Sequence, residues 1–291
     1  MLEKALQRLP LTKLKITLAK VLYAATVLVF GKKKRVIERD GIRYEVDLSE
    51  GIDLSLFLFG AFQKHITANR YSRIPEDAVI IDVGANFGIM SLRFAKAAPR
   101  GTVYAFEPTH FALSRLRTNL GLNPELAARI HVTNAFVSDS NTDEARITAF
   151  ASWKVGGSRE SNEALHPMHW GSAKSTAGAG AVTLDEFTAK NSVQRIDLIK
   201  IDTDGHEFEV LRGAKETLRR TRSNVIFEVG GYMMKEKGID FGFYLGYFGE
   251  LGYRLFDAPT GREVLASTMD ELIPLNGTTD VIAVPADRVQ A

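Results

Sequence analysis

The chain has 291 residues, and none of them is cysteine. Disulfide bonds, thiolate-bound zinc, iron–sulfur clusters and cysteine nucleophiles are therefore excluded, and the composition does not favour an oxidising compartment. Long apolar runs are also missing. Residues 17–30 contain one charge but are fewer than the roughly 20 apolar residues that a membrane-spanning helix needs. We predict a cytoplasmic location, with a peripheral position on the inner face of a membrane as the alternative.

The composition is that of a folded globular protein. Hydrophobic residues make up 45% of the chain, charged residues 25% and aromatic residues 9%, which excludes whole-chain disorder, collagen and a coiled coil. A chain of this length forms one large α/β domain or two small domains.

Positive charge is concentrated near the N-terminus. The net charge is only +2, but residues 1–45 hold eleven Lys or Arg against four Asp or Glu, a balance of +7, and the remainder carries −5. Within residues 11–35, apolar side chains recur at helical spacing before the run Lys32-Lys33-Lys34-Arg35. We expect an amphipathic helix with a basic end, which either packs on its own domain or lies on an anionic membrane.

Three regions follow one another along the chain. Residues 1–35 hold the basic helix, residues 36–75 are predicted to form a hairpin and a helical lead-in, and residues 76–291 form the main domain. In the main domain β-rich runs alternate with helical patterns, which indicates βαβ units and a parallel sheet. The predicted elements are strands at 78–83, 101–106, 130–137, 196–201 and 224–229, helices at 89–98, 111–122, 207–220 and 241–251, and a closing hairpin of 253–256 and 280–284.

Residues 140–182 interrupt this alternation with glycine, serine, alanine and polar residues. We predict a lid-like insertion that closes over substrate, with Trp170 covering an apolar or sugar face. His166 and His169 lie in the same segment. Without cysteine or an HExxH motif they do not favour zinc, and simple solvent exposure is the alternative.

The most informative stretch runs from Val79 to Leu92. An apolar strand ends at Asp82, glycines follow at positions 84 and 88, and a helical pattern starts directly afterwards. Gly84 permits a tight turn and a close approach to a ligand, and Gly88 permits contact where the helix begins. The spacing differs from the G-x-G-x-x-G dinucleotide pattern, and no G-K-[ST] is present, so a P-loop is excluded.

A carboxylate follows the second strand of this unit. Glu107 ends the sequence VYAFE, nineteen residues beyond Gly88. At the carboxyl end of that strand a carboxylate can hold the two hydroxyls of a ribose. Glycines alone often serve only to close a turn, but the order strand, Asp-x-Gly-x-x-x-Gly, helix, strand and Glu indicates a nucleoside-containing cofactor.

These segments resemble the FkbM family of S-adenosylmethionine-dependent methyltransferases, within the class I superfamily. The resemblance covers about residues 40–229 and rests on the blocks DVGANFG, VYAFEP, NAFVSD, TLDEF and IDLIKIDTDGHEFEVLRGA, in the family's order. It implies an α/β, Rossmann-like fold with a seven-stranded, mostly parallel sheet and helices on both faces. The basic helix of residues 1–35, which the resemblance does not cover, is expected as an N-terminal helical extension. Gln63 stands where the family is expected to have Glu, so that block assigns no cofactor contact.

The resemblance also implies the cofactor contacts. Glu107 would hold the ribose of S-adenosylmethionine, and Asn134 would face its adenine, with an amide in place of the carboxylate common in class I enzymes. Asp202 is a further predicted contact. The residues predicted to surround the methionine part are Asp82, Gly84, Asn86 and Gly88.

The segment KIDTDGHE is the predicted catalytic centre, because it leaves the carboxyl end of a buried strand. A hydroxyl attacks a sulfonium methyl group more readily when a base accepts its proton. His206 is the default base, since its ordinary pKa is about 6.5, and Asp204 or Glu207 can serve if burial raises the pKa. Each has a structural alternative: a backbone hydrogen bond for His206, a turn for Asp204 and the helix dipole for Glu207.

A further carboxylate, Glu228, ends the next strand in VIFEVGG. With Asp202 it is a candidate ligand for a hard divalent cation, since such ions bind carboxylate oxygens. We do not favour a metal site. Without a cation, Glu228 contacts substrate or simply ends a strand.

We predict an S-adenosylmethionine-dependent methyltransferase that modifies a hydroxyl of a small molecule such as a sugar, glycolipid or polyketide, a substrate class implied by the resemblance. Two alternatives stay open. One is a nicotinamide-dependent oxidoreductase, disfavoured by the missing G-x-G-x-x-G and Tyr-x-x-x-Lys patterns, and the other is a membrane-surface protein with a vestigial fold. No nucleic acid is expected as a partner, because the charged pattern at 212–222 lacks interleaved aromatic residues.

Overall fold

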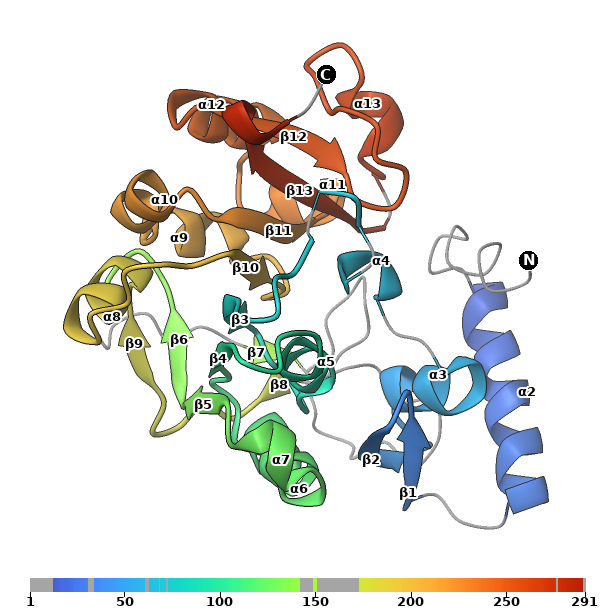
Figure 1. Cartoon of the computed structure of the whole chain (residues 1–291). Helices are drawn as coiled ribbons and strands as arrows, with labels where there is room; N and C mark the ends of the chain where they lie inside the picture. Colours follow the sequence, from blue (N-terminus) through green and yellow to red (C-terminus); the bar gives the residue numbers. More distant parts are fainter. Residues whose placement is uncertain are drawn as a thin grey trace.

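A seven-stranded sheet lies at the centre of the molecule (Figure 1). The computed structural model describes residues 13–30, 34–60, 63–67, 69–71, 73–141, 149–150, 173–275 and 277–289. In spatial order the strands are β12 (Tyr253–Asp257), β13 (Thr279–Pro285), β11 (Asn224–Val229), β10 (Leu198–Ile201), β3 (Val79–Val83), β4 (Thr102–Phe106) and β5 (Ile130–Thr133). The five strands from β11 to β5 pair in parallel, and β13 runs antiparallel to both of its neighbours.

Helices cover both faces of the sheet because successive strand residues point to opposite sides. In β3, Ile80 joins a buried cluster with Phe94, whereas the next residue, Ile81, joins a second cluster with Val210 and Phe248. The predicted α/β fold with a mostly parallel sheet is confirmed. The helices that follow β3 are α5 (Ile89–Ala97), α6 (His110–Leu122), α7 (Pro124–Ala127), α8 (Leu184–Lys190), α9 (Glu207–Arg212), α10 (Lys215–Thr221), α11 (Gly231–Glu236), α12 (Phe241–Glu250), α13 (Met269–Leu272) and the 3-10 turn η1 (Ala286–Arg288).

Before the sheet come α2 (Lys13–Phe30), the hairpin of β1 (Lys34–Arg39) and β2 (Ile42–Asp47), α3 (Gly51–Phe59) and α4 (Lys64–Thr67). The predicted hairpin is present, and both Asp40 and Gly41 have the positive φ that a tight hairpin turn requires. Tyr44 and Val46 of β2 are buried in the same cluster as α5. No described helix is long and apolar enough to cross a membrane.

Asn119 of α6 and Asn123, directly after this helix, attach the hairpin to the main domain. The side-chain oxygen of Asn119 accepts a hydrogen bond from the backbone N–H of Glu45 at 2.7 Å, and that of Asn123 accepts one from Arg43 at 2.9 Å. The amide nitrogen of Asn119 also donates to the carbonyl of Phe87 at 2.8 Å. One buried side chain therefore connects the edge of β2 with the glycine-containing turn after β3.

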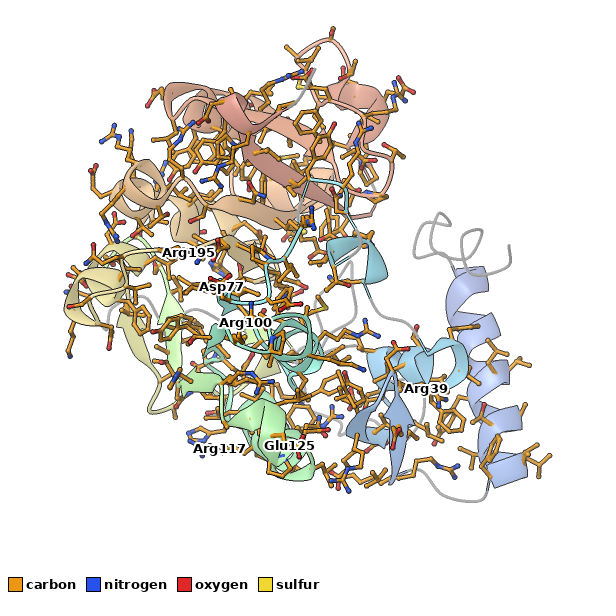
Figure 2. The ribbon with its side chains drawn as sticks, viewed as in Figure 1. Arg39, Asp77, Arg100, Arg117, Glu125 and Arg195 are labelled. Atoms are coloured by element: carbon orange, nitrogen blue, oxygen red, sulfur yellow. The ribbon has the colours of Figure 1, made fainter. Side chains whose placement is uncertain are left out.

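Charged side chains fix the amino ends of the central strands (Figure 2). Arg195 lies 2.9 Å from Asp77 and 3.0 Å from Asp197, and Asp197 accepts a hydrogen bond from the backbone N–H of Val79 at 2.8 Å. Arg195 and Asp77 are exposed, so this pair contributes little free energy. It lies at the end of the sheet opposite the glycine-containing turn.

Two predicted elements are divided in the structure. The predicted strand 130–137 consists of β5 and a separate β6 (Ala135–Val137), which pairs with β9 (Gly180–Val182) outside the main sheet. The predicted helix 207–220 consists of α9 and α10. The break falls at Gly213, where only glycine fits, because a Cβ at this position would lie 2.0 Å from the carbonyl oxygen of Ser138. Helix α11 is not predicted from the sequence.

The predicted lid lies largely outside the described residues. Positions 142–148 and 151–172, which include His166, His169 and Trp170, are not described, and the lid hypothesis stays a prediction. Of this segment the structure describes the pair β7 (Ala149–Phe150) and β8 (Ala173–Lys174), together with β9.

Candidate active site

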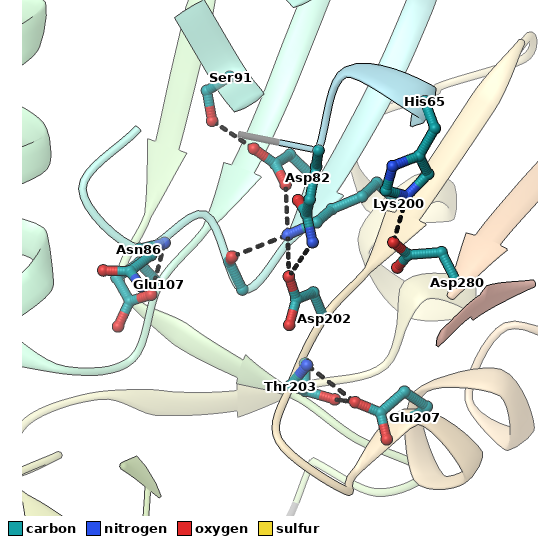
Figure 3. Close-up of polar contacts among 12 residues, drawn as sticks. His65, Asp82, Asn86, Ser91, Glu107, Lys200, Asp202, Thr203, Glu207 and Asp280 are labelled. Atoms are coloured by element: carbon teal, nitrogen blue, oxygen red, sulfur yellow. Dashed lines mark hydrogen bonds and ion pairs between the residues drawn. The ribbon is translucent and has the colours of Figure 1, made fainter. Parts of the chain in front are cut away.

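Polar side chains gather where β3, β4, β10 and β11 end (Figure 3). From β3 the chain continues outward through β4 and β5, whereas β10 is added on the opposite side of β3. The gap between β3 and β10 is therefore the point at which the strand order reverses, and open α/β sheets bind ligands outside the carboxyl ends of strands at such a point. Asn86 and Asp204, in the loops after β3 and β10, have positive φ, as does Gln63 directly before α4.

The turn after β3 depends on its glycines. Gly84 has a φ of 76° and Gly88 a φ of 90°, and the backbone N–H groups of Gly84 and Ala85 both donate to the carbonyl of Phe106. A Cβ at Gly84 would lie 1.9 Å from the carbonyl oxygen of Asp202. The sequence predicts a glycine here for approach to a ligand; the structure shows that glycine is also required for contact between two loops of the protein.

Glu107 connects the loops after β3 and β4. One carboxylate oxygen accepts from the backbone N–H of Asn86 at 2.9 Å, and the other accepts from the N–H and hydroxyl of Thr109 at 2.8 and 2.6 Å. Burial raises the pKa of Glu107, and these three hydrogen bonds oppose that rise. A carboxylate offers about four acceptor positions, so capacity for a further donor remains.

Asn134 contacts the backbone of the same loop. Its side-chain nitrogen donates to the carbonyls of Glu107 and Pro108 at 2.9 and 3.1 Å. The amide therefore orients the peptide that carries Glu107, and its side-chain oxygen is the group that can serve as an acceptor elsewhere.

Lys200, which was not predicted from the sequence, is the central cation of the site. Its side chain is 4% exposed, and Nζ lies 3.5 Å from Oδ1 of Asp82 and 3.3 Å from Oδ2 of Asp202 while donating to the carbonyl of Gly84 at 3.2 Å. Burial alone lowers the pKa of Lys200, but the two carboxylates together raise it above its usual value. The occurrence of a lysine within the otherwise apolar strand sequence IDLIKI is the feature of the sequence that could have indicated this role.

Two neighbouring side chains orient these carboxylates (Figure 3). The hydroxyl of Ser91, on α5, donates to Oδ2 of Asp82 at 2.5 Å, and the amide of Gln63 donates to Oδ2 of Asp202 at 3.1 Å. Asp82 is fully buried. Asp82 and Asp202, both predicted from the sequence, are thus brought together and held in place by hydrogen bonds and by Lys200.

An acidic cluster of Asp202, Asp204 and Glu228 lies beside Lys200. One carboxylate oxygen from each lies within 4.8 Å of the others. Burial and the charges of Asp202 and Asp280 raise the pKa of Glu228 well above its usual value. Solvent reaches the Asp204 side chain, yet desolvation by the surrounding protein, followed by the charges of Asp202 and Glu207, raises the pKa of Asp204 to about 8. Asp202 and Glu228, the two candidate ligands of the disfavoured metal site, are therefore adjacent.

A histidine that the sequence analysis does not single out lies next to this cluster. Nε2 of His65, on α4, is 2.5 Å from a carboxylate oxygen of Asp280. Asp280 pairs in register with Glu228 across β13 and β11. His65 therefore gives Asp280, the register partner of Glu228, a hydrogen-bonding partner (Figure 3).

The other two predicted catalytic residues point to different partners. Oε1 of Glu207 accepts from the N–H and hydroxyl of Thr203 at 2.9 and 3.0 Å and from the N–H of Gly205 at 3.3 Å, so it fixes the loop after β10. Nδ1 of His206 lies 3.3 Å from Glu209 and 3.0 Å from Nζ of Lys237. Within the described residues, His206 is not among the side chains of the acidic cluster.

The fold and the site together define a Rossmann-like methyltransferase domain: a parallel sheet with one antiparallel strand, a glycine turn after β3 and carboxylates at the ends of β4 and β10. Residues 82–255 match the family model described as the methyltransferase FkbM domain. The chain therefore belongs to the FkbM methyltransferase family, as the sequence blocks predict.

Several relatives with curated names are named as methyltransferases. Over 155 residues the chain is 31% identical to the 2-O-methyltransferase NoeI of Sinorhizobium fredii, a match that covers 50% of this chain and 61% of the relative. Over 145 residues it is 25% identical to the hexuronic acid methyltransferase AglP of Haloferax volcanii, covering 50% and 53%. The crystal structure of a methyltransferase FkbM from Methylobacillus flagellatus aligns with a TM-score of 0.44 and 14% identity, over 75% of this chain and 47% of that one. The matches thus span less than two thirds of each of these proteins.

Proposed function

We propose that the protein is an S-adenosylmethionine-dependent O-methyltransferase that acts on a hydroxyl of a small, sugar-like acceptor. The observation that carries this proposal is the position of Asp204, an accessible carboxyl with a raised pKa, beside Asp202 at the reversal point of the strand order. Membership of the FkbM family supports the transfer of a methyl group. The relatives named 2-O-methyltransferase and hexuronic acid methyltransferase support a sugar hydroxyl as acceptor.

The residues present fit this cofactor. S-adenosylmethionine supplies an electrophilic methyl group on a cationic sulfur and an ammonium group, both of which favour an acidic surrounding. Oδ1 of Asp82 and Oε1 of Gln63 are buried, and within the described residues neither accepts a hydrogen bond, so both can accept one from a ligand donor. Glu107 would hold the ribose, Asn134 would face the adenine, and Gly84, Asn86 and Gly88 would form the turn against the methionine part.

Asp204 is the proposed base of the reaction. Its carboxylate takes the proton of the acceptor hydroxyl while that oxygen bonds to the methyl carbon and the carbon–sulfur bond breaks, which gives a methyl ether and S-adenosylhomocysteine. The reasons for preferring it to His206 are its solvent access and its place in the acidic cluster, since His206 is engaged by Glu209 and Lys237. Glu207 acts as a positioning residue, because it holds the loop that carries Asp204.

The pH dependence of turnover tests the base. Because the base must be ionised and the pKa of Asp204 is raised to about 8, kcat/KM is expected to rise with pH up to about pH 8 and then level off. Asp204→Asn is expected to lower kcat by about 100-fold or more and to remove this rise. Release of S-adenosylhomocysteine with a panel of hexuronic acids and oligosaccharides measures both effects.

His206→Ala is the matched comparison for that experiment. It is expected to keep cofactor binding and most of the turnover, since the imidazole lies against Lys237 and Glu209. If His206→Ala loses turnover while Asp204→Asn stays active, the base is His206 and not Asp204.

Calorimetric titration tests the cofactor itself. S-adenosylmethionine and S-adenosylhomocysteine are expected to bind with micromolar or tighter affinity in EDTA, and NADH is expected to give no heat of binding. Tighter binding in Mg²⁺ would make Asp202, Asp204 and Glu228 a metal site. No binding of either sulfur compound, with or without Mg²⁺, would contradict the proposed function and favour a vestigial fold.

A further inference from the structure

Two side chains that precede the main sheet in the sequence reach across the active site. The amide of Gln63 donates to Oδ2 of Asp202, directly after β10, at 3.1 Å. Two residues later, Nε2 of His65 lies 2.5 Å from Oδ2 of Asp280 on β13. Strand β11 lies between β10 and β13, and its penultimate residue is Glu228 of the acidic cluster. The imidazole of His65 therefore lies beside this cluster, at the edge of the sheet where the carboxylates gather (Figure 3).

The partner of His65 determines which ring nitrogen carries a proton. A carboxylate only accepts hydrogen bonds, so Nε2 of His65 donates to Asp280. In the neutral imidazole Nδ1 then has the lone pair and acts as an acceptor. Among the described residues Nδ1 has no hydrogen-bonding partner, and the His65 side chain is 31% exposed. His65 can therefore accept a hydrogen bond from a donor that enters the site.

The position of His65 favours the methyl acceptor as the source of that donor. The residues proposed to hold the cofactor come from β3 and from the loops after β4 and β5, whereas His65 lies on the opposite side of β10, at β11 and β13. The groups around it are acceptors as well, since Asp204 and Glu228 are carboxyl residues within the same cluster. A ligand with several hydroxyls supplies a donor to more than one of these groups, and a ligand with a single hydroxyl does not.

We infer that His65 binds a second hydroxyl of the acceptor, apart from the hydroxyl that Asp204 deprotonates. This inference rests on the proposed function and narrows its substrate class to polyhydroxylated acceptors such as a sugar ring. The hydroxyl that meets His65 donates to Nδ1 and is not methylated. Asp280 is a positioning residue, because it holds the imidazole and fixes its protonated nitrogen. The competing explanation is that His65 only anchors α4 to β13.

Two substitutions of His65 separate these explanations. In His65→Gln the amide can still donate to Asp280, but no acceptor stands at the position of Nδ1. In His65→Asn the side-chain oxygen can occupy that position, but the contact with Asp280 is lost. With an acceptor found by release of S-adenosylhomocysteine, His65→Gln is expected to raise KM by about 3- to 10-fold, to keep kcat and to bind S-adenosylhomocysteine normally. His65→Asn is expected to raise KM less, whereas an anchoring role predicts the reverse order.

Analogues of the acceptor that each lack one hydroxyl complete the test. Removal of the hydroxyl that meets His65 is expected to raise KM of the unchanged protein by about 3- to 10-fold. The same analogue is expected to leave KM of His65→Gln as it is, because the interaction is already absent. An unchanged KM in His65→Gln, or losses that multiply for every analogue, would overturn the inference.

His131→Gln is the matched control. His131 is exposed on β5 and stacks on Tyr104, so its substitution is expected to leave KM unchanged. Thermal melting of the ligand-free variants reports whether each is folded. If S-adenosylhomocysteine binds but no hydroxylated compound is methylated, the inferred acceptor is wrong and the cofactor assignment stands. If S-adenosylhomocysteine does not bind, the proposed function fails and this inference fails with it.

Discussion

Lys200→Met is expected to lower the free energy of unfolding by about 3 to 5 kcal/mol. Methionine matches the length of the lysine stem, but it leaves the carboxylate of the fully buried Asp82 without its cation and removes the charge beside Asp202. Removing one partner of a buried ion pair lowers the free energy of unfolding by more than the intact pair contributes, because the remaining charge stays desolvated. Urea denaturation followed by fluorescence measures the difference.

A surface lysine provides the comparison for this variant. Lys190 ends α8 and is exposed, so Lys190→Met is expected to change stability by less than about 0.5 kcal/mol. Adding Asp82→Asn to Lys200→Met is expected to recover part of the lost stability, since the uncompensated charge is then absent. If Lys200→Met proves as stable as the unchanged protein, the ion pair has no structural role.

The pH range of this stabilisation follows from the direction of the pKa shift. The pKa of Lys200 is raised in the folded protein above its value of about 10.4 in the unfolded chain. A cation with a raised pKa contributes its full stabilisation below the unfolded value and loses it only as pH rises through the folded one. The stability difference due to this lysine ionisation is therefore expected to stay constant across the neutral range and to disappear only in strong alkali.

Glu107→Ala is expected to weaken binding of S-adenosylhomocysteine by about 100-fold or more. A hydrogen bond from a ribose hydroxyl to this charged group contributes about 1.5 to 3 kcal/mol, which alone corresponds to roughly 10- to 150-fold in affinity. The variant also removes the acceptor of the Asn86 and Thr109 N–H groups, so the turn after β3 loses its connection to the loop after β4. Glu107→Gln keeps an acceptor oxygen and is expected to show a smaller loss.

Glu125→Ala is the matched control for the binding experiment. Glu125 is an exposed carboxylate on α7, and its removal is expected to leave affinity unchanged. Calorimetric titration gives the affinity, and thermal melting of the ligand-free protein separates loss of binding from loss of folding. Unchanged affinity in a folded Glu107→Ala variant would contradict the assignment of the ribose to this carboxylate.

The main elements of the fold could be predicted because each follows from local patterns. The apolar runs that become β3, β4, β10 and β11 are short and bounded by turn residues, and the hairpin turn at Asp40-Gly41 has a distinctive composition. The errors arose where a distant segment sets the local geometry. The predicted helix is divided at Gly213, where the carbonyl of Ser138 leaves no room for a side chain, and no feature within that helical pattern indicates such a contact.

The candidate site was predicted only in part for the same reason. Asp82, Glu107, Asp202 and Glu228 were found because each ends a strand, and the carboxyl ends of parallel strands meet at one edge of a sheet. His65 was not recognised, because its partner Asp280 is separated from it by 215 positions in the sequence. Lone histidines on short helical segments carry no local pattern that indicates such a partner.

By itself the sequence determined the α/β class, the positions of the main strands along the chain, the glycine turn and the family, because propensity, periodicity and motif spacing are all local properties of the chain. Only the tertiary structure decided which polar groups lie close together. Parallel pairing of β3 with β10 brings Lys200 next to Asp82, although 118 positions separate them in the sequence. The folding of the loop after β10 turns Glu207 onto Thr203 and leaves Asp204 accessible. Coulombic and hydrogen-bond energies depend on distance and burial, and folding alone sets both.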